Sequence, residues 1–244
     1  MKNVQPVSRE VELADDADKT HAWWQSSAVP AEGTWAEKRK LAASLRRLIG
    51  LAVLSDPEPG VLETAAREMD EISQQLEGQP QRSTLDAFAE TSTAGNVHAL
   101  FDRSPVVGLS NPLSPPMRLE LEGDTVRGFV NFGSAYEGPP GHVHGGVVAE
   151  LFDELLGFAQ SITGHPGMTA TLSIDYLRPT PLHTDLNCRA SVARVEGRKI
   201  YAEGELCKDE IVLVRGRGMF VSVDRKRMQK MMEQAGLSRG AEAG

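Results

Sequence analysis

From about residue 104 onward the sequence contains one helix-like segment among six strand-like segments. The helix-like segment runs from about Gly146 to Ser161, after the second strand candidate and before the third. The strand candidates cover residues 117–121, 125–132, 169–176, 185–195, 199–207 and 211–223. Because strands and helices do not alternate, the pattern argues against a parallel βαβ sheet and predicts an antiparallel α+β domain.

The first third of the chain has a helical pattern instead. Residues 37–54 and 61–76 each repeat apolar side chains at close to helical spacing, and a Pro/Gly cluster over residues 56–60 separates them. We expect an antiparallel helical hairpin, in which the sequence shows no chemistry. The chain then divides into a helical N-terminal extension (1–100), a β-rich domain (101–224), and a C-terminal helix with a flexible tail (225–244).

The distribution of charge along the chain limits which kinds of partner it can bind. The net charge of −8 argues against nucleic acid, and most of it lies in residues 1–90, which hold 16 acids and 10 bases. Residues 178–227 carry 11 bases and 7 acids, a surplus that suits either an anionic small molecule or a solvated strand edge. No apolar run approaches the roughly 20 residues of a membrane helix, and no apolar signal region stands at the start. We therefore expect a cytoplasmic protein without a membrane span.

Two cysteines lie on the two arms of one predicted hairpin. Pairing Cys188 with Leu206 and Val192 with Ala202 aligns the apolar faces and places the sulfurs of Cys188 and Cys207 on opposite faces of the sheet. A slip of one residue makes them diagonal neighbours. Neither register favours a disulfide, so we expect two reduced structural thiols.

The densest candidate site runs from Gly138 to Asp153. Proline and glycine oppose a helix at its start, and Gly145–Gly146 stands where the helix begins, with N–H groups suited to an anion or oxyanion. Asp153 falls within an apolar stripe, so we expect it on a buried face; the stripe consists of Ala149, Phe152, Leu156 and Ala159. A buried carboxylate is costly unless it is paired or used. Asp153 therefore either pairs with a buried polar group or performs chemistry.

These motifs, with several that follow them, resemble a known family. The motif residues, in order, are His144-Gly145-Gly146, Ala149, Asp153, Gly157, Met168-Thr169-Ala170, Tyr176, Arg178-Pro179-Thr180-Pro181 and Val195-Glu196-Gly197-Arg198-Lys199. Over roughly residues 105–223 the chain is similar to hotdog-fold acyl-CoA thioesterases of the phenylacetate-degradation (PaaI) type and to thioesterase superfamily members 4 and 5. The likeness does not cover the N-terminal third.

The resemblance implies a fold, an activity and an assembly. The fold is α+β, a hotdog fold whose central helix is wrapped by an antiparallel sheet, here with an N-terminal helical extension. The activity is hydrolysis of a fatty-acyl or arylacyl-CoA to free acid and CoA, as in fatty acid metabolism, with no cofactor. The assembly is a homodimer or a dimer of dimers.

The resemblance also implies residue roles. Asp153 is the catalytic base or nucleophile, the Gly145 N–H contacts the thioester carbonyl, and Thr169 assists the carboxylate or water. From its place beside the Gly-Gly turn, and not from the resemblance, His144 either fixes the turn, which we favour, or transfers protons. The coenzyme A side is implied for Gly146, Asn187, Arg198, Lys199, Ile200, Tyr201 and Asp175. Asp175 and Leu177 stand where the mammalian relative has an amide and a lysine, which suggests weaker or rearranged phosphate contacts.

Helix length adds an independent constraint. Gly145 and Asp153 are eight residues apart, or roughly 12 Å along one helix at 1.5 Å per residue. Both cannot touch one thioester carbon. We therefore expect Gly145 of one chain to act with Asp153 of another, which demands a dimer.

Other interpretations remain open. One is a hotdog module that binds acyl-CoA without turnover; another is a hotdog enzyme of other chemistry, such as a hydratase. The hydratase is disfavoured because the β-rich part lacks the Asp-x4-His pair, and Asp16 and His21, which match that spacing, lie in a polar leader. A metal site is not expected, because the candidate histidines show no recognised ligand pattern; they are His142, His144, His165 and His183.

Overall fold

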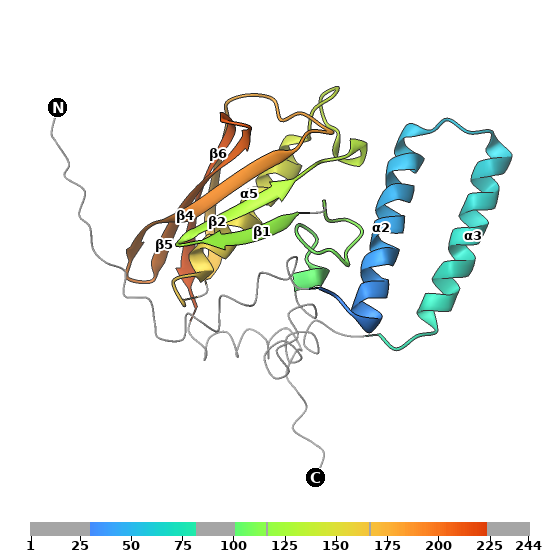
Figure 1. Cartoon of the computed structure of the whole chain (residues 1–244), viewed down its shortest axis with the longest axis horizontal. Coiled ribbons are helices and arrows are strands. Elements are labelled where there is room, and N and C mark those ends of the chain that lie inside the picture. The colour runs from blue at the N-terminus through green and yellow to red at the C-terminus, as the bar shows by residue number, and fades with distance from the viewer. Residues whose placement is uncertain (1–29, 82–100, 116, 166, 224–244) are drawn as a thin grey trace, which may run out of the picture.

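The computed structural model describes residues 30–81, 101–115, 117–165 and 167–223, and within them it forms one six-stranded sheet (Figure 1). Neighbouring strands are antiparallel throughout, in the order β1-β2-β4-β5-β6-β3. The strands are β1 Arg118–Glu122, β2 Thr125–Val130, β3 Gly167–Tyr176, β4 Leu186–Glu196, β5 Lys199–Lys208 and β6 Ile211–Ser222. The predicted antiparallel α+β domain is confirmed.

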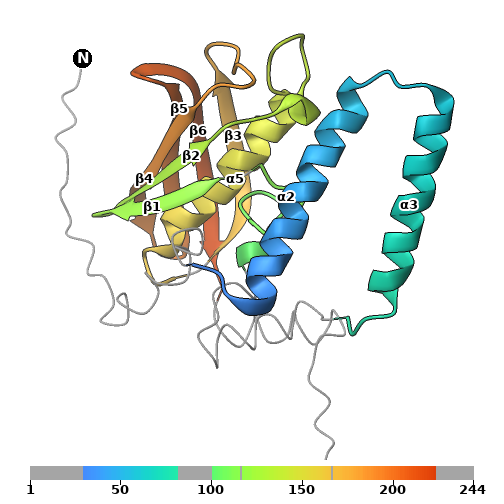
Figure 2. The same ribbon diagram turned by 45° about the vertical axis from the view of Figure 1, so that its right-hand side comes forward.

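The long helix α5, Gly145–Ser161, packs against one face of this sheet (Figure 2). Its buried side chains include Leu151, Phe152, Leu155 and Leu156, each at most 1% exposed. The strands alternate, and their inner residues such as Ile200, Leu206 and Phe220 join the same core. Each such side chain contributes about 1.5–3 kcal/mol on full burial, so this contact is the main source of stability. Among the described residues no helix covers the opposite face of the sheet, which carries polar side chains such as Arg189, Glu205 and Arg215.

Two glycines of β6 set how closely α5 approaches the sheet. A Cβ on Gly216 would overlap the ring of Phe152, and a Cβ on Gly218 would lie 2.8 Å from the ring of Phe220. Both positions pair within continuous ladders, so their backbone is ordinary strand. The missing side chains therefore provide space for the aromatic core.

Strand β3 lies at an edge of the sheet. It is hydrogen-bonded to β6 on one side, and no strand of the described chain pairs with its other side. It is ten residues long and mostly exposed, with Met168 and Tyr176 among the exposed apolar side chains. A long, uncovered edge of this kind is a ready template for pairing with another chain.

The predicted helical hairpin is present as α2, Gly33–Leu54, and α3, Pro59–Glu77, which run antiparallel beside the sheet domain (Figure 1). Ala42 of α2 is buried, whereas α3 has no buried residue. Only α2 therefore docks on the domain.

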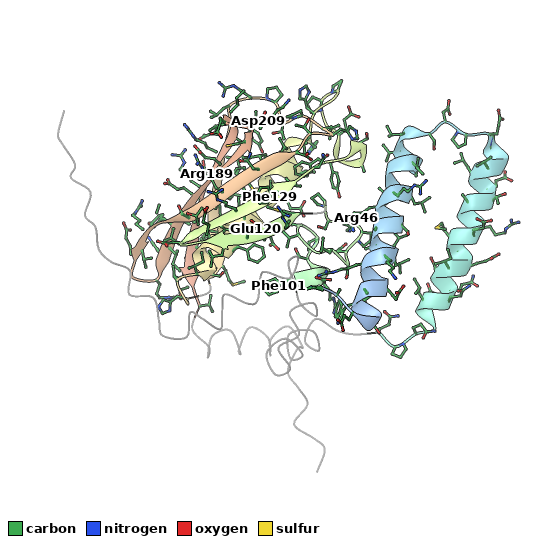
Figure 3. All side chains as sticks on the ribbon, in the orientation of Figure 1. Arg46, Phe101, Glu120, Phe129, Arg189 and Asp209 are labelled. Atoms are coloured by element: carbon green, nitrogen blue, oxygen red, sulfur yellow. The ribbon has the colours of Figure 1, made fainter. Side chains whose placement is uncertain are left out.

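Arginines fasten α2 to the loops of the domain. Arg39 donates both Nε and Nη2 to the carboxylate of Asp102, at 2.7 and 2.9 Å, and Asp102 is fully buried. Arg46 points from α2 toward the same region (Figure 3) and donates to the carbonyls of Leu109 and Asn111. Breaking a buried pair of the Arg39–Asp102 type typically costs about 3–5 kcal/mol, because one charge is left uncompensated.

Of the two registers considered for the cysteine hairpin, the structure has the one that aligns the apolar faces. Cys188 pairs with Leu206, Val192 pairs with Ala202, and both cysteines are free and buried. Burial raises the pKa of the Cys188 thiol to about 12, so it stays protonated at neutral pH. Both thiols are therefore structural in this chain.

Some expectations fall outside the described residues. They are the polar leader with Asp16 and His21, and the C-terminal helix over residues 225–234. The domain boundaries at residues 100 and 224 stay predictions. No helix in the described part of the chain is long and apolar enough to cross a bilayer.

The contact between Gly216 and Phe152 yields a stability prediction. Gly216→Ala should lower the free energy of unfolding by about 1–3 kcal/mol, because the added methyl group overpacks the core. Urea denaturation followed by circular dichroism measures the change. Gly133→Ala is the matched control, since a Cβ there meets nothing within 4 Å. Equal stability of the two variants would contradict the packing role of Gly216.

Candidate active site

The start of α5 is held by a histidine cap. His144 is the N-cap residue, and its Nδ1 accepts a hydrogen bond from the Gly146 N–H at 3.1 Å. The backbone N–H of His144 donates to the carbonyl of Tyr136 at 2.8 Å. An accepting Nδ1 places the proton of a neutral imidazole on Nε2. This geometry fits the turn-fixing role that we favour for His144.

Gly145 is the first residue of α5. A first-turn N–H has no intrahelical acceptor, and the N–H of Gly145 has none elsewhere in the described residues. The Gly145 carbonyl accepts a hydrogen bond from the Tyr176 hydroxyl at 2.6 Å. A donor therefore stands ready at the positive end of the helix dipole, with Tyr176 of β3 beside it.

Asp153 and Thr169 are brought together. The Thr169 hydroxyl, at the start of β3, donates to Asp153 Oδ1 at 2.8 Å. The expectation that Asp153 lies on a buried face is wrong for the single chain, where its side chain is exposed. Phe152, Leu156 and Ala159 are buried as expected, but Asp153 bonds to Thr169 on edge strand β3, whose outer side pairs with no strand among the described residues.

The predicted catalytic groups thus form two clusters on one chain. Strand β3 connects them, because its Thr169 end bonds to Asp153 and its Tyr176 end bonds to Gly145. Eight helical residues, roughly 12 Å, separate Gly145 from Asp153. The single chain does not assemble both groups around one atom.

The predicted coenzyme A residues also fall into two groups, one near each end of β3. The cross-strand rung Ile200–Phe220–Thr169 places the Arg198 to Tyr201 segment near the Thr169 end of β3. Asn187 and Asp175 lie toward the Tyr176 end. Their assignment to coenzyme A stays a prediction.

The side chains of this group differ in their availability. Ile200 is 1% exposed and packs in the core, so only its backbone is accessible to a ligand. The Arg198 guanidinium donates to the carbonyl of Ser222. The centre of the Tyr201 ring lies 3.7 Å from the guanidinium carbon of Arg194. Lys199 begins β5 with an exposed side chain.

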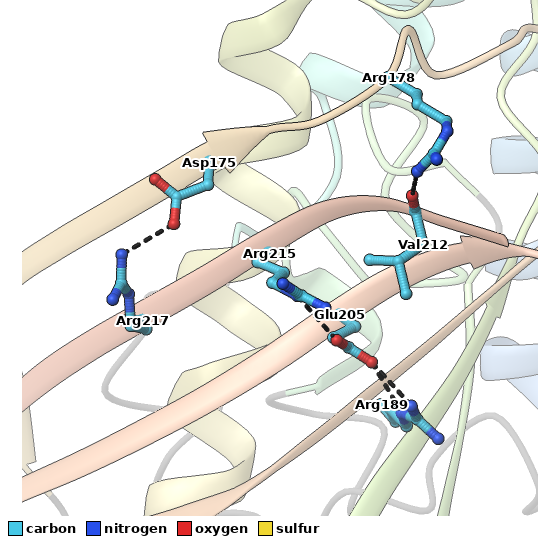
Figure 4. Close-up of polar contacts among 7 residues, drawn as sticks. All are labelled: Asp175, Arg178, Arg189, Glu205, Val212, Arg215 and Arg217. Atoms are coloured by element: carbon cyan, nitrogen blue, oxygen red, sulfur yellow. Dashed lines mark hydrogen bonds and ion pairs between the residues drawn. The ribbon is translucent and has the colours of Figure 1, made fainter. Parts of the chain in front are cut away.

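Three arginines of the basic C-terminal part lie on one face of the sheet, where carboxylates pair with them (Figure 4). Glu205 bridges Arg189 and Arg215, at 2.7 and 3.0 Å, and these hydrogen bonds hold the pKa of Glu205 below its usual range. Arg217 pairs with Asp175 at 2.7 Å. These pairs fit the alternative of a solvated sheet surface better than an open anion site.

Sequence reasoning missed Glu154, the residue after Asp153. Burial raises the pKa of this carboxyl, against an opposing hydrogen bond from the Ser104 hydroxyl at 2.7 Å; the nearby Asp153 and Glu150 charges raise it further. The Ser104 oxygen also accepts from the amides of Val106 and Val107. Glu154 therefore ties α5 to the loop before the sheet, a contact that helical spacing does not reveal.

Three of the histidines named as possible metal ligands, His142, His144 and His183, have other partners. A ring nitrogen of His142 lies 2.8 Å from the Pro140 carbonyl, and one of His183 lies 2.7 Å from the Ser134 hydroxyl. Among the residues that the structure describes, no three His, Cys, Asp or Glu side chains gather in a metal-binding group.

Comparisons with known proteins identify the family of this chain. The family model described as the thioesterase superfamily matches residues 140–215, which include α5, β3, β4 and β5. The crystal structure of a thioesterase superfamily protein matches with 36% identity and a TM-score of 0.68, over 80% of this chain and 94% of that one. The chain belongs to the thioesterase superfamily. The hotdog fold implied by the resemblance is thereby confirmed.

The match to this solved structure also includes part of the N-terminal extension. Residues 101–244 make up less than 80% of the chain, so the match reaches into the first 100 residues. This thioesterase superfamily protein therefore shares part of the N-terminal extension, which the sequence resemblance left unexplained.

Curated relatives match over shorter segments. The acyl-coenzyme A thioesterase THEM4 of Xenopus laevis is 35% identical over 74 residues, 30% of this chain and 33% of that protein. The protein of the same name from Bos taurus is 32% identical over 94 residues, 38% of each chain. The matches span only about a third of the length of these relatives.

The environment of Glu154 gives a pH-dependent prediction. Its raised pKa means that the folded chain holds this proton more tightly than the unfolded chain. The Glu154 contribution to the free energy of unfolding therefore falls as the pH rises from the ordinary glutamate pKa of about 4.3 to the raised folded value, and is constant above it. Glu154→Gln keeps an acceptor for Ser104 and removes the titration.

The stability gain of Glu154→Gln over the wild type should thus grow between mildly acidic and neutral pH and then level off. Urea denaturation at a series of pH values and one protein concentration measures it. Glu210→Gln, in an exposed turn, is the control. A pH-independent difference for Glu154→Gln would show that the carboxyl is not destabilised by burial.

Proposed function

We propose that this protein is an acyl-CoA thioesterase that hydrolyses a fatty-acyl or arylacyl-CoA to the free acid and CoA. The observation that carries the proposal is the Thr169–Asp153 hydrogen bond of 2.8 Å, at the end of a strand edge in a chain of the thioesterase superfamily. It leaves Asp153 Oδ2 available to a water molecule or to the substrate. The proposal includes a cytoplasmic location and a homodimer or a dimer of dimers.

In this mechanism the substrate carbonyl oxygen binds the Gly145 N–H at the helix terminus. One such donor contributes about 3 kcal/mol to transition-state stabilisation. Asp153 removes a proton from water, which adds to the carbonyl carbon; alternatively, its carboxylate attacks the carbon directly and water then hydrolyses the anhydride. The C–S bond breaks, and the CoA sulfur leaves as a thiolate that takes up a proton. Thr169 orients the carboxylate, and His144 holds the turn that presents Gly145.

Each site in this proposal uses two chains. The β3 edges of two copies, paired antiparallel about a two-fold axis, bring the Thr169 end of one strand beside the Tyr176 end of the other. Asp153 of one copy then faces Gly145 of the second. The exposure of β3 and of Asp153 in the single chain supports this arrangement.

The same pairing unites the proposed coenzyme A residues. Arg198, Lys199 and Tyr201, with the backbone of Ile200, come from the Thr169 end of one chain. Gly146, Asn187 and Asp175 come from the Tyr176 end of the other. Asp175 pairs with Arg217 in the single chain, so its negative charge is neutralised where it would lie near a phosphate.

Release of free thiol from a panel of medium-chain, long-chain and arylacyl-CoAs tests the proposal. The wild type should hydrolyse at least one class, and Asp153→Asn should lower kcat by about 100-fold or more, because the base or nucleophile is lost. Gly145→Pro should lower kcat by about 100- to 1,000-fold, since it removes the N–H donor while a proline at the first helical position keeps α5 intact.

Gly145→Ala is the matched control. It retains the N–H, and its Cβ would make only ordinary contact with the Tyr176 ring, at 3.5 Å and beyond. Undiminished hydrolysis by Asp153→Asn would overturn the role of Asp153. Binding of acyl-CoAs by the wild type without hydrolysis of any chain would favour the non-catalytic module.

A further inference from the structure

Helix α2 carries an apolar stripe on the side that faces away from the domain. Arg39, Ala42 and Arg46 mark the docked side. Leu41, Leu48 and Leu51 lie on another face, and Leu51 is 50% exposed. Their spacing of seven and three residues forms a continuous row along the helix.

Helix α3 carries a matching stripe. The residues are Leu62, Ala65, Met69, Ile72 and Leu76. Their alternating spacing of three and four residues is the seam of a helical bundle or coiled coil. None is buried, and Leu62 is 54% exposed, so the hairpin alone does not cover either stripe.

The two helices carry charged rows of opposite sign. Lys40 and Arg47 are seven residues apart on α2, and Glu63, Asp70 and Glu77 repeat at the same interval on α3. The whole helices carry net charges of +4 and −4. Within the described ranges no ion pair joins α2 to α3, although Lys40 pairs with Glu37 in its own helix. The two rows are therefore available to another partner.

We propose that a second copy of this chain, other than the copy paired through β3, covers the hairpin, so that two hairpins form a four-helix bundle and join two β3 dimers. Helix α2 of each copy lies beside α3 of the other, which brings the basic helix against the acidic helix and buries all four stripes. The excess of acid on α3 argues against an anionic membrane as the occupant. The Arg39–Asp102 pair fastens α2 to the domain, so the bundle joins whole molecules.

Light scattering after size exclusion, on the full chain, tests this assembly. The variant Leu48→Glu with Ile72→Glu should have half the molar mass of the wild type, because two charges enter the bundle core. Ile211→Glu, which adds a charge at an exposed apolar position in the sheet domain, should keep the wild-type mass. Circular dichroism checks that the helices persist.

A charge exchange provides a second variant that spares the apolar stripes. Lys40→Glu with Arg47→Glu should weaken assembly at low salt, and adding Glu63→Lys with Asp70→Lys should restore it. An unchanged mass in both the stripe and the two-charge variants, or a wild type with the mass of one chain, would overturn the proposal. The mass measurement uses no substrate, so it stands apart from the test of hydrolysis.

Discussion

The burial of α5 against the inner face of the sheet is the contact on which the rest of the structure depends. Gly216 and Gly218 provide space for Phe152 and Leu156, so the helix lies close to β6 and alongside β3. This contact fixes where Gly145 begins the helix and where Asp153 emerges two turns later. The same packing that stabilises the domain therefore positions both proposed reactive groups.

That geometry also imposes a separation. A straight helix keeps Gly145 and Asp153 roughly 12 Å apart, and no local rearrangement brings both to one carbonyl carbon. Strand β3 bonds to each group at opposite ends, through Tyr176 and Thr169. Its open edge offers the simplest way to juxtapose the two clusters, by pairing with the same strand of a second chain. The proposed site and the proposed assembly thus have one physical origin.

Periodicity predicts the fold of this chain well, because helices and strands differ in how often apolar residues recur. The alternation even gives the register of Cys188 with Leu206, since a slip would turn a whole face outward. The hydrogen bond from Thr169 to Asp153 matches the pairing that the family resemblance implies.

The features that the sequence did not predict depend on contacts between residues far apart in the chain. The exposure of Asp153 depends on what covers the β3 edge. The apolar spacing of the helix carries no information about that edge. The Glu154–Ser104 and Arg217–Asp175 pairs join residues 50 and 42 positions apart, so no local spacing reveals them. Apolar spacing predicts the helices α2 and α3, but it does not show that their stripes remain open.

The most direct test of the two-chain site mixes two inactive variants. Asp153→Asn subunits keep Gly145, and Gly145→Pro subunits keep Asp153, so random exchange should restore one intact site in each mixed dimer, or about a quarter of wild-type hydrolysis. Each variant alone should stay near background. A mixture no more active than its separate components, despite demonstrated subunit exchange, would contradict a site shared between two chains.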